Sequence, residues 1–296
     1  MTRNWEETFE SWSAGPGQTE TYRIYNAERM IRDAIAASDK LKNRGISVFT
    51  QGSYRNNVNV RQESDIDIGV VCSDTFYYDF ESQNLRELVT PTILPASYSF
   101  SDFKRDLQEA LETKFGQSSV RRGNKAFDIS ANSYRVEADV APFFEHRRYY
   151  SQTDFHKGVQ MLSDYGQVIC NWPDQHYDNG VSKNTATSRR YKRTVRIFKK
   201  LSIEMTEARI AAADLPGFFI ECLIWNVPNE VFSNHNSHLE RVRQCILSVF
   251  RDTQQDDTCS EWGEVNELKY LFRGQPWTRA QANDFMVHAY NYLGFE

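Results

Sequence analysis

The first half of the chain combines helical and extended hydrophobic patterns. Between about residues 19 and 42, apolar side chains recur with helical spacing, which predicts an amphipathic helix: Ile24, Ala27, Ile31, Ala34 and Ile35. Gly45, just beyond this stretch, suits the left-handed position that closes many helices. Four β-type runs follow, "ISVFTQ", "DIDIGVVC", "AFDISAN" and "RVEADVAPFF", with a helical stretch at about 100–115 between the second and third. This order predicts a mixed α/β unit.

Helical patterns replace the β-type runs from about Gly166 onward. In "SRRYKRTVRIFKKLSIEM", basic residues lie on one face of a predicted helix, and another face carries Tyr191, Val195, Phe198 and Ser202. Further helices are expected at about 218–226, 238–251 and 278–293. The predicted fold class is therefore α/β, in its α+β form, with a mixed sheet and an α-helical lobe. We place the boundary between residues 145 and 166, which gives units of 1–160 and 161–296.

Composition and charge narrow the classes of protein and ligand. The 296 residues include 35 Lys and Arg against 40 Asp and Glu, a formal net charge of -5, which argues against a surface dedicated to coating duplex nucleic acid. Any bound anion should therefore meet a local basic patch. The five cysteines are far apart and form no CxxC pair, which favours a reducing cytoplasm over a disulfide framework or a zinc site. Neither a signal sequence nor a membrane-spanning run is expected.

Two carboxylates stand out in the stretch "QGSYRNNVNVRQESDIDIGVV". Alternate side chains of a strand share one face, so Asp65 and Asp67 should point the same way while the isoleucines beside them pack inward. Neighbouring carboxylates repel each other and raise each other's pKa unless a cation is present. Mg²⁺ prefers such oxygen ligands, so the pair predicts a divalent-metal site.

A third carboxylate and a turn complete the predicted site. In "RVEADVAPF", apolar residues alternate with Glu137 and Asp139, and Asp139 lies nearer the strand end; we predict Asp139 as the third ligand, with Glu137 as the alternative. The predicted phosphate contacts are Gln51, Gly52 and Ser53, because a glycine lets backbone approach a phosphate and a serine hydroxyl can donate to it. The plain alternative is a set of solvated acids on an edge strand.

These residues resemble a known family. The run that begins at Gln51 resembles the hG(G/S)…DhD signature of polymerase-β-like nucleotidyltransferases and of the bacterial cGAS/DncV-like nucleotidyltransferases (CD-NTases). Four further stretches resemble landmarks of clade E of that family, the group that contains cyclic UMP-AMP synthase: "VRRGNKAFDI", "NWPDQHYDNGVSKN", "RYKRTVRIFKKL" and "FFIECLIWNVPN". The resemblance extends from about Trp12 to Asn229.

The resemblance implies a fold and an activity. The expected architecture is a polymerase-β-like mixed sheet and an α-helical lobe, with the active site in the cleft between them and the N-terminal helix bridging both. The implied reaction converts UTP and ATP into a pyrimidine-containing cyclic dinucleotide, cyclic UMP-AMP or cyclic di-UMP, with release of pyrophosphate. Within the family such a product is a second messenger of CBASS anti-phage defence. Implied partners are CBASS regulatory proteins and a downstream effector, with no stable nucleic acid and no membrane.

The resemblance also implies roles for single residues. Two Mg²⁺ ions, or Mn²⁺ in their place, would be held by Asp65, Asp67 and Asp139. Lys192 matches a lysine that binds the donor triphosphate. Gly217 stands where several relatives carry a serine, so a hydroxyl contact to phosphate would be absent or would come from Ser202 or the backbone.

Asn171, in "CNWP", matches the asparagine through which pyrimidine-using relatives read uracil. Its amide offers one acceptor and two donors, which can pair with N3–H and a carbonyl of uracil at once. A site that hydrogen-bonds one base edge discriminates strongly, because a wrong base leaves polar groups unpaired. The alternative is an asparagine that caps the turn before Trp172 and Pro173.

Several positions keep two interpretations. Arg121 and Arg122 either contact phosphate or lie on a solvated loop. Tyr54 and Tyr191 are candidate surfaces for base stacking, whereas His176 lacks metal-ligand spacing and the aromatic residues of "FFIECLIW" are expected in the core. Competing functions are a nucleotidyltransferase that makes a purine cyclic dinucleotide or modifies an RNA or small molecule, a nucleotide-binding sensor, and a protein-interaction module.

Overall fold

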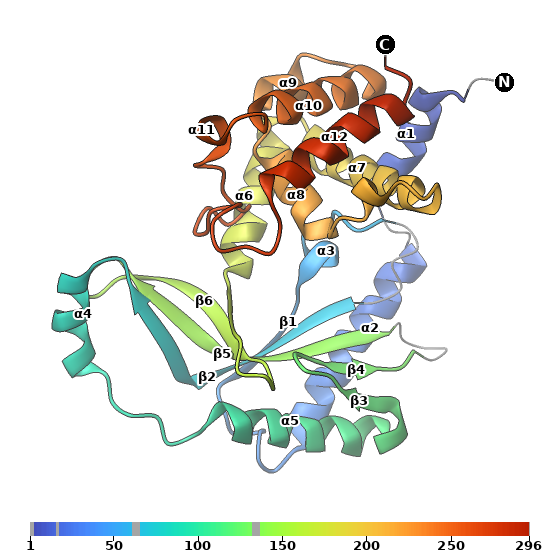
Figure 1. Cartoon of the computed structure of the whole chain (residues 1–296). Helices are drawn as coiled ribbons and strands as arrows, with labels where there is room; N and C mark the ends of the chain where they lie inside the picture. Colours follow the sequence, from blue (N-terminus) through green and yellow to red (C-terminus); the bar gives the residue numbers. More distant parts are fainter. Residues whose placement is uncertain (1–2, 16–17, 61–65, 132–136, 296) are drawn as a thin grey trace. The chain divides into compact units, whose positions relative to one another are not determined.

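The computed structural model describes residues 3–15, 18–60, 66–131 and 137–295. The chain divides into two compact units (Figure 1). The sheet unit comprises Gly17–Tyr54 and Ser64–Pro173, and the helical unit comprises Met1–Pro16, Arg55–Glu63 and Asp174–Glu296. This division differs from the predicted units of 1–160 and 161–296, because the N-terminal segment belongs to the helical unit and the sheet unit extends to Pro173.

The sheet unit contains a mixed sheet, as predicted. Its described strands are β1 (Ile46–Thr50), β2 (Ile66–Phe80), β3 (Val120–Arg122), β4 (Phe127–Ile129), β5 (Ala138–Tyr149), β6 (Phe155–Leu162) and β7 (Val168–Asn171). Their order is β1-β2-β5-β4-β3, and β6 pairs with both β5 and β7. Strands β2 and β5 are parallel, and the other pairs are antiparallel. The strands β6 and β7 were not predicted, and β7 lies beyond the point where the extended patterns were expected to stop.

Two long helices pack on one face of this sheet (Figure 1). The helices of the unit are α2 (Gln18–Ala37), α3 (Gly52–Arg55), α4 (Gln83–Val89) and α5 (Phe100–Phe115), with short 3-10 turns at Thr90–Thr92 and Gln117–Ser119. Ile31 of α2 and Phe103 of α5 share a core with Ile68 and Val140 of the two parallel strands. The prediction that Gly45 closes α2 is wrong, because α2 ends at Ala37 and Gly45 has no positive φ.

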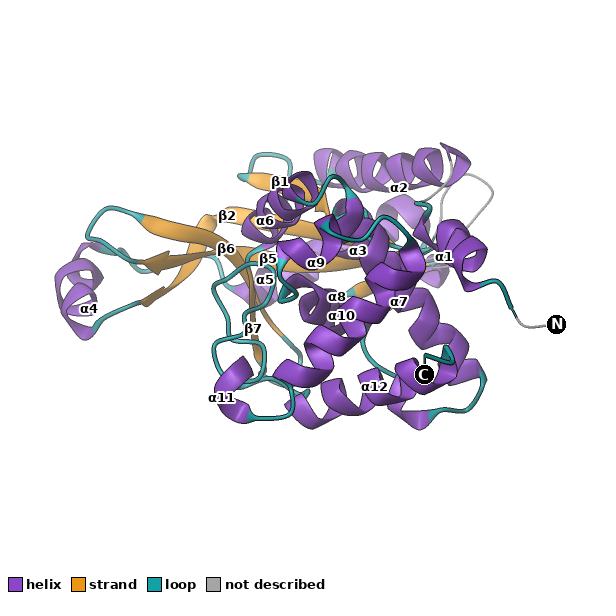
Figure 2. Cartoon of the chain, turned by 90° about the horizontal axis from the view of Figure 1, so that it is seen from above, coloured by secondary structure: helices purple, strands orange, loops and turns teal. Residues whose placement is uncertain are grey.

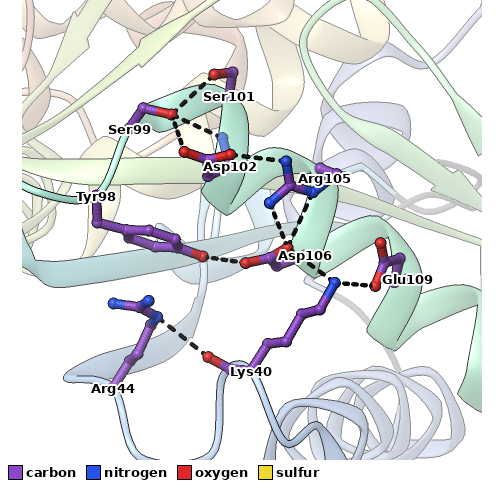
Figure 3. A network of polar contacts seen from close by, with 9 residues as sticks. All are labelled: Lys40, Arg44, Tyr98, Ser99, Ser101, Asp102, Arg105, Asp106 and Glu109. Atoms are coloured by element: carbon purple, nitrogen blue, oxygen red, sulfur yellow. Dashed lines mark hydrogen bonds and ion pairs between the residues drawn. The ribbon is translucent and has the colours of Figure 1, made fainter.

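A polar network joins α5 to the turn that follows α2 (Figure 3). The carboxylate of Asp106 is buried and accepts hydrogen bonds from the Tyr98 hydroxyl at 2.9 Å and from Arg105 Nη2 at 3.0 Å. Lys40 forms ion pairs with Asp106 at 3.5 Å and with Glu109 at 2.6 Å. Burial opposes ionisation of Asp106, but these contacts outweigh it and lower its pKa. The ionised carboxylate of Asp106 therefore holds α5 against the turn that contains Lys40.

The helical unit is built around α7 (Figure 2). Its elements are α1 (Trp5–Ser13), α6 (Pro173–Ala186), α7 (Arg190–Glu207), the 3-10 turn Ala211–Ala213, α8 (Gly217–Trp225), α9 (Asn229–Ser233), α10 (His238–Asp252), α11 (Asp256–Cys259) and α12 (Arg279–Tyr292). Phe9 of α1 lies fully buried in the same core as Val195 of α7. Arg196 of α7 donates to the Ser13 carbonyl at 2.7 Å. These contacts explain why α1, a helix that the sequence pattern did not predict, belongs to this unit.

A membrane-spanning helix is not found: none of the helices in the described ranges is long and apolar enough to cross a bilayer.

Candidate nucleotide and metal site

Two predicted metal ligands lie side by side on the sheet. Parallel pairing of β2 with β5 sets Asp67 directly opposite Asp139. On the other side of β5, β4 sets Asp128 opposite Asp139. The three carboxylates share one face, because the residues that alternate with them are buried on the other: Ile66, Ile68, Phe127, Ile129, Ala138 and Val140. Neighbouring strands are about 4.8 Å apart, which suits carboxylates that share a cation.

The remaining predicted ligands are placed less directly. Asp65 lies outside the described residues, so its role stays a prediction. Glu137 precedes β5 and is exposed, and its carbonyl accepts the first hydrogen bond of the pairing, from Ile66 N at 3.0 Å. Asp139 lies within the strand and is half-buried, which favours it over Glu137. No group of three or more His, Cys, Asp or Glu side chains suited to a metal occurs among the described residues alone.

The predicted phosphate-binding turn touches one of these carboxylates. Gly52 has a φ of 66°, in the left-handed region, and a Cβ at this position would collide with Asp67 Oδ2. The backbone N–H of Gln51 donates to the Asp67 carbonyl at 2.8 Å. Ser53 follows within the single turn of α3. The local fold therefore brings the turn and the Asp67 carboxylate into direct contact.

Asn171 is the last residue of β7, where its backbone pairs with Val159 of β6. Its side chain is exposed, and its amide makes no hydrogen bond to another residue in the part of the chain that the structure describes. The alternative of a turn-capping amide therefore finds no support in the contacts. The donors and the acceptor of Asn171 are left available for a ligand.

The end of β7 is held by a close approach to β6. A Cβ on Gly158 would come within 2.7 Å of the Asn171 carbonyl oxygen and 2.9 Å of Trp172 Nε1. Trp172 is buried, with the Arg148 guanidinium 4.3 Å from its ring centroid and the His146 ring 5.6 Å away, edge-on. The backbone of Asn171 is therefore fixed by packing of its neighbour Trp172.

Arg148 is fixed in turn by Asp79. Its Nε and Nη2 donate to the Asp79 carboxylate at 3.1 and 2.9 Å, and His146 Nε2 lies 3.3 Å from the same group. Burial opposes ionisation of Asp79, but the hydrogen bonds and charges of His146 and Arg148 outweigh it and lower the pKa to about 2. Asp79 is therefore ionised at neutral pH and keeps the guanidinium beneath Trp172.

Two lysines of α7 lie in a buried polar cluster of the helical unit. Lys192 and Lys199 are only 7% and 5% exposed and, seven residues apart, share one helix face. Glu221 of α8, 3% exposed, hydrogen-bonds His176 of α6 at 2.9 Å. Burial opposes ionisation of Glu221, but His176 and the two lysines outweigh it and lower its pKa. The charges of the two ammonium groups thus favour the ionised form of the Glu221 carboxylate.

The positive charge of the two lysines in this cluster is available to bind an anion. Within the described residues, neither Lys192 Nζ nor Lys199 Nζ has a hydrogen bond or an ion pair within 4.0 Å. Burial lowers the pKa of Lys192, as does the Arg196 charge, and Glu221 opposes this shift. Lys199 Nζ lies 3.5 Å from the point where a Cβ on Gly217 would be. Lys199 Nζ therefore lies beside Gly217, the position at which the resemblance implies a serine in several relatives.

Two other candidates, Ser202 and Tyr191, have structural roles. Ser202 is buried, and its hydroxyl donates to the Ala213 carbonyl at 2.5 Å, which contradicts the prediction that this hydroxyl contacts the nucleotide. Tyr191 is fully buried, edge-on to the rings of Trp225 and Phe232, which removes it as a stacking surface. The predicted helix face that contained both residues is the core face of α7.

Comparisons with known proteins agree with this arrangement. A family model described as nucleotidyltransferase domain matches residues 30–118, and the cGAS/DncV-like nucleotidyltransferase C-terminal helical domain matches residues 178–294. The chain is 41% identical to the cyclic dipyrimidine nucleotide synthase CdnE of Cecembia lonarensis over 100% of both chains. It is 37% identical to the cyclic dipurine nucleotide synthase of Elizabethkingia meningoseptica, with 98% of this chain and 99% of that one covered.

A solved structure gives the same result for the fold. The Rhodothermus marinus CdnE c-UMP-AMP synthase with Apcpp and Upnpp matches with a TM-score of 0.84 and 26% identity over 98% of this chain and 97% of that one. The predicted polymerase-β-like mixed sheet and helical C-terminal domain are confirmed, as is the prediction of an enzyme of the nucleotidyltransferase class. The chain belongs to the cGAS/DncV-like nucleotidyltransferase family.

Proposed function

We propose that this enzyme makes a pyrimidine-containing cyclic dinucleotide, either cyclic UMP-AMP from UTP and ATP or cyclic di-UMP from two molecules of UTP. The observation that carries the proposal is the available amide of Asn171, fixed at the end of β7 by Gly158 and Trp172. Two relatives of similar identity are named for dipyrimidine and dipurine products, so base choice depends on individual side chains rather than on the fold. The product would serve as a second messenger for a downstream effector in CBASS defence.

The carboxylate face suits a divalent metal. Nucleotidyltransferases of this family use divalent metal ions, and adjacent hard oxygen ligands such as Asp67 and Asp139 suit Mg²⁺. Two ions, Mg²⁺ or Mn²⁺ in its place, would be held by Asp65, Asp67 and Asp139. When bound, they would neutralise charge on the attacking and leaving oxygens.

The protein's own residues position the reactants. A ribose hydroxyl oxygen attacks the α-phosphorus of the donor nucleotide, the bond from that phosphorus to pyrophosphate breaks, and the hydroxyl proton is lost. Gly52 and Ser53 would bind donor phosphates beside Asp67. Lys192 and Lys199 are candidates for further phosphate contacts, because their buried ammonium groups lack direct hydrogen-bond partners in the described ranges.

Replacing Lys199 with Met should raise the KM for nucleoside triphosphate by roughly 10-fold or more, since a hydrogen bond to a charged group is worth about 1.5 to 3 kcal/mol. Lys192→Met should act in the same direction. Steady-state kinetics of each variant measure the effect, and Lys200→Met is a matched control because Lys200 lies beside Trp12 and Glu204 instead. Equal KM values for all four proteins would remove both lysines from the proposal.

The KM should also depend on pH. The charged form of Lys192 binds a triphosphate, and its pKa is lowered from 10.5, so the charge is lost at a lower pH than for an ordinary lysine. Raising the pH towards 10.5 should therefore raise the KM of the wild type. A Lys192→Arg variant, whose charge persists in this range, should show a smaller rise. Identical pH profiles for the two proteins would contradict the assignment.

Incubation with α-labelled nucleoside triphosphates, singly and in pairs, with Mg²⁺ or Mn²⁺, tests the proposed function. We expect a product that contains uracil, identified by its mass, with no other acceptor present. A product that forms only after RNA or a small molecule is added would favour the alternative nucleotidyltransferase. Nucleotide binding without turnover would favour the sensor.

Asn171→Ser should shift base preference from pyrimidine towards purine. The serine hydroxyl has one donor and cannot reproduce the paired contacts of the amide. The loss of one such pairing is worth roughly 1 to 3 kcal/mol, by analogy with groove readout. Competition between UTP and GTP measures the ratio, and the unfolding temperature serves as the control because the amide bonds no described residue. An unchanged product ratio would exclude Asn171 as the base-reading residue.

A further inference from the structure

The hairpin of β3 and β4 directs two adjacent arginines to opposite faces of the sheet. Its pairing sets Arg122 opposite Phe127, which is fully buried on the α5 side, and sets Arg121 opposite Asp128. Arg122 donates to Gln108 of α5 at 3.0 Å and to Asp164 at 2.9 Å. Arg121 lies instead on the face that carries the predicted metal ligands. Arg122 therefore has a structural role in β3, which neither sequence interpretation, a phosphate contact or a solvated loop, had foreseen.

Arg121 continues the row of carboxylates across the sheet. The register aligns one residue from each of four neighbouring strands: Asp67, Asp139, Asp128 and Arg121. Arg121 Nε donates to Asp128 Oδ2 at 2.7 Å, and Nη2 forms an ion pair with the same oxygen. The Cα atoms of Arg121 and Asp139 are separated by two strand spacings, about 10 Å. The guanidinium therefore lies near Asp128, the direct neighbour of Asp139.

The ion pair between Arg121 and Asp128 contributes little to the stability of the fold. The Arg121 side chain is 84% exposed, and exposed ion pairs contribute little to folding. A guanidinium presents five N–H donors, and Asp128 engages only its Nε and Nη2 edge. The Nη1 edge has no hydrogen-bond partner among the described residues. Such a planar, bidentate donor suits phosphate above all.

The two ends of the row are chemically different. At the Asp67 end the backbone turn at Gly52 makes direct contact, and this is where the proposed function places the donor phosphates. At the other end stands Arg121. Nucleotidyl transfer between two triphosphates requires room for a second set of phosphates, so we propose that Arg121 binds a phosphate of the attacking nucleotide and that Asp128 positions its guanidinium. This inference rests on the proposed function of the carboxylate face.

Arg121→Gln should raise the KM of one nucleotide by roughly 10- to 100-fold, the loss expected for a charge-assisted contact, with kcat at saturation and the unfolding temperature little changed. The KM for UTP is measured at saturating ATP, and the KM for ATP is measured at saturating UTP. Arg122→Gln is the matched control: it should lower the unfolding temperature, because it breaks the contacts to Gln108 and Asp164, and leave both KM values unchanged. Unchanged KM values in Arg121→Gln would overturn the assignment.

A double variant separates phosphate binding from simple neutralisation of Asp128. If Arg121 only cancels that carboxylate beside Asp139, then adding Asp128→Asn to Arg121→Gln should restore the KM, and the proposal fails. If Arg121 contacts phosphate, the raised KM persists in the double variant. Equilibrium binding of ATP and UTP to the wild type, the single variant and the double variant compares the same contact without turnover. If the wild type formed no product, that result would count against the proposed function, and the binding comparison would still test the contact between Arg121 and phosphate.

Discussion

Asp139→Asn and Asp67→Asn are each expected to slow cyclic dinucleotide formation by about 10³-fold or more, because these carboxylates would hold the metal ions whose positive charge stabilises the transition state by several kcal/mol. The two side chains occupy paired positions on β2 and β5, so each amide keeps the shape and removes only the charge. Product formation from labelled UTP and ATP measures the loss. Asp65→Ala combined with Asp67→Ala should likewise abolish synthesis while the fold stays intact.

Thermal unfolding distinguishes this effect from misfolding. Adjacent carboxylates repel each other, so the amide variants should unfold in the absence of metal at the wild-type temperature or above it. Mg²⁺ with nucleotide should raise the unfolding temperature of the wild type, as any ligand of the native state does, and should do so much less for the variants. Glu137→Gln is the matched control, because Glu137 is exposed and precedes β5. A greater loss in Glu137→Gln than in Asp139→Asn would reverse the assignment.

Local periodicity predicts those parts of the site that depend on a single strand. Alternation along β2 and β5 indicates the outward face of Asp67 and Asp139, since the intervening positions are apolar. Strand β6 was missed, because it contains Gly158 and polar residues and is held by its pairing with β5 and β7. Pairing between strands is non-local, so the periodicity of a short stretch of sequence cannot show which strand lies beside it.

The errors on α7 have two different causes, one local and one non-local. The predicted face with Tyr191 and Ser202 is the buried face, and the helical pattern alone is sufficient to place such residues in a core. The helical pattern left Lys199 and Lys200 as alternatives on the basic face, because the choice of Lys199 depends on Gly217 and Glu221, which come from a different helix. The assignment of α1 to the helical unit likewise depends on a hydrogen bond from Arg196 to Ser13, two residues far apart in the sequence.

Gly52→Ala is expected to lower the rate by about 10²-fold although it adds only one methyl group. The new Cβ would collide with Asp67 Oδ2, so either the carboxylate or the turn must move, and a displacement of about 1 Å in an active site can cost this much. The residue must also adopt a φ of 66°, which costs a non-glycine residue about 1 to 2 kcal/mol. Steady-state rates at saturating nucleotide and Mg²⁺ measure the catalytic part.

Gly166→Ala isolates the cost of the backbone conformation from the collision. Gly166 lies in the same unit with a φ of 78°, and a Cβ there would meet nothing within 4 Å. Both alanine variants should therefore lose a similar amount of unfolding free energy to strain, and only Gly52→Ala should also lose activity. If the two variants were equally active, then contact between the turn and Asp67 would have no part in catalysis, and Gly52 would be required only for the backbone conformation that it adopts.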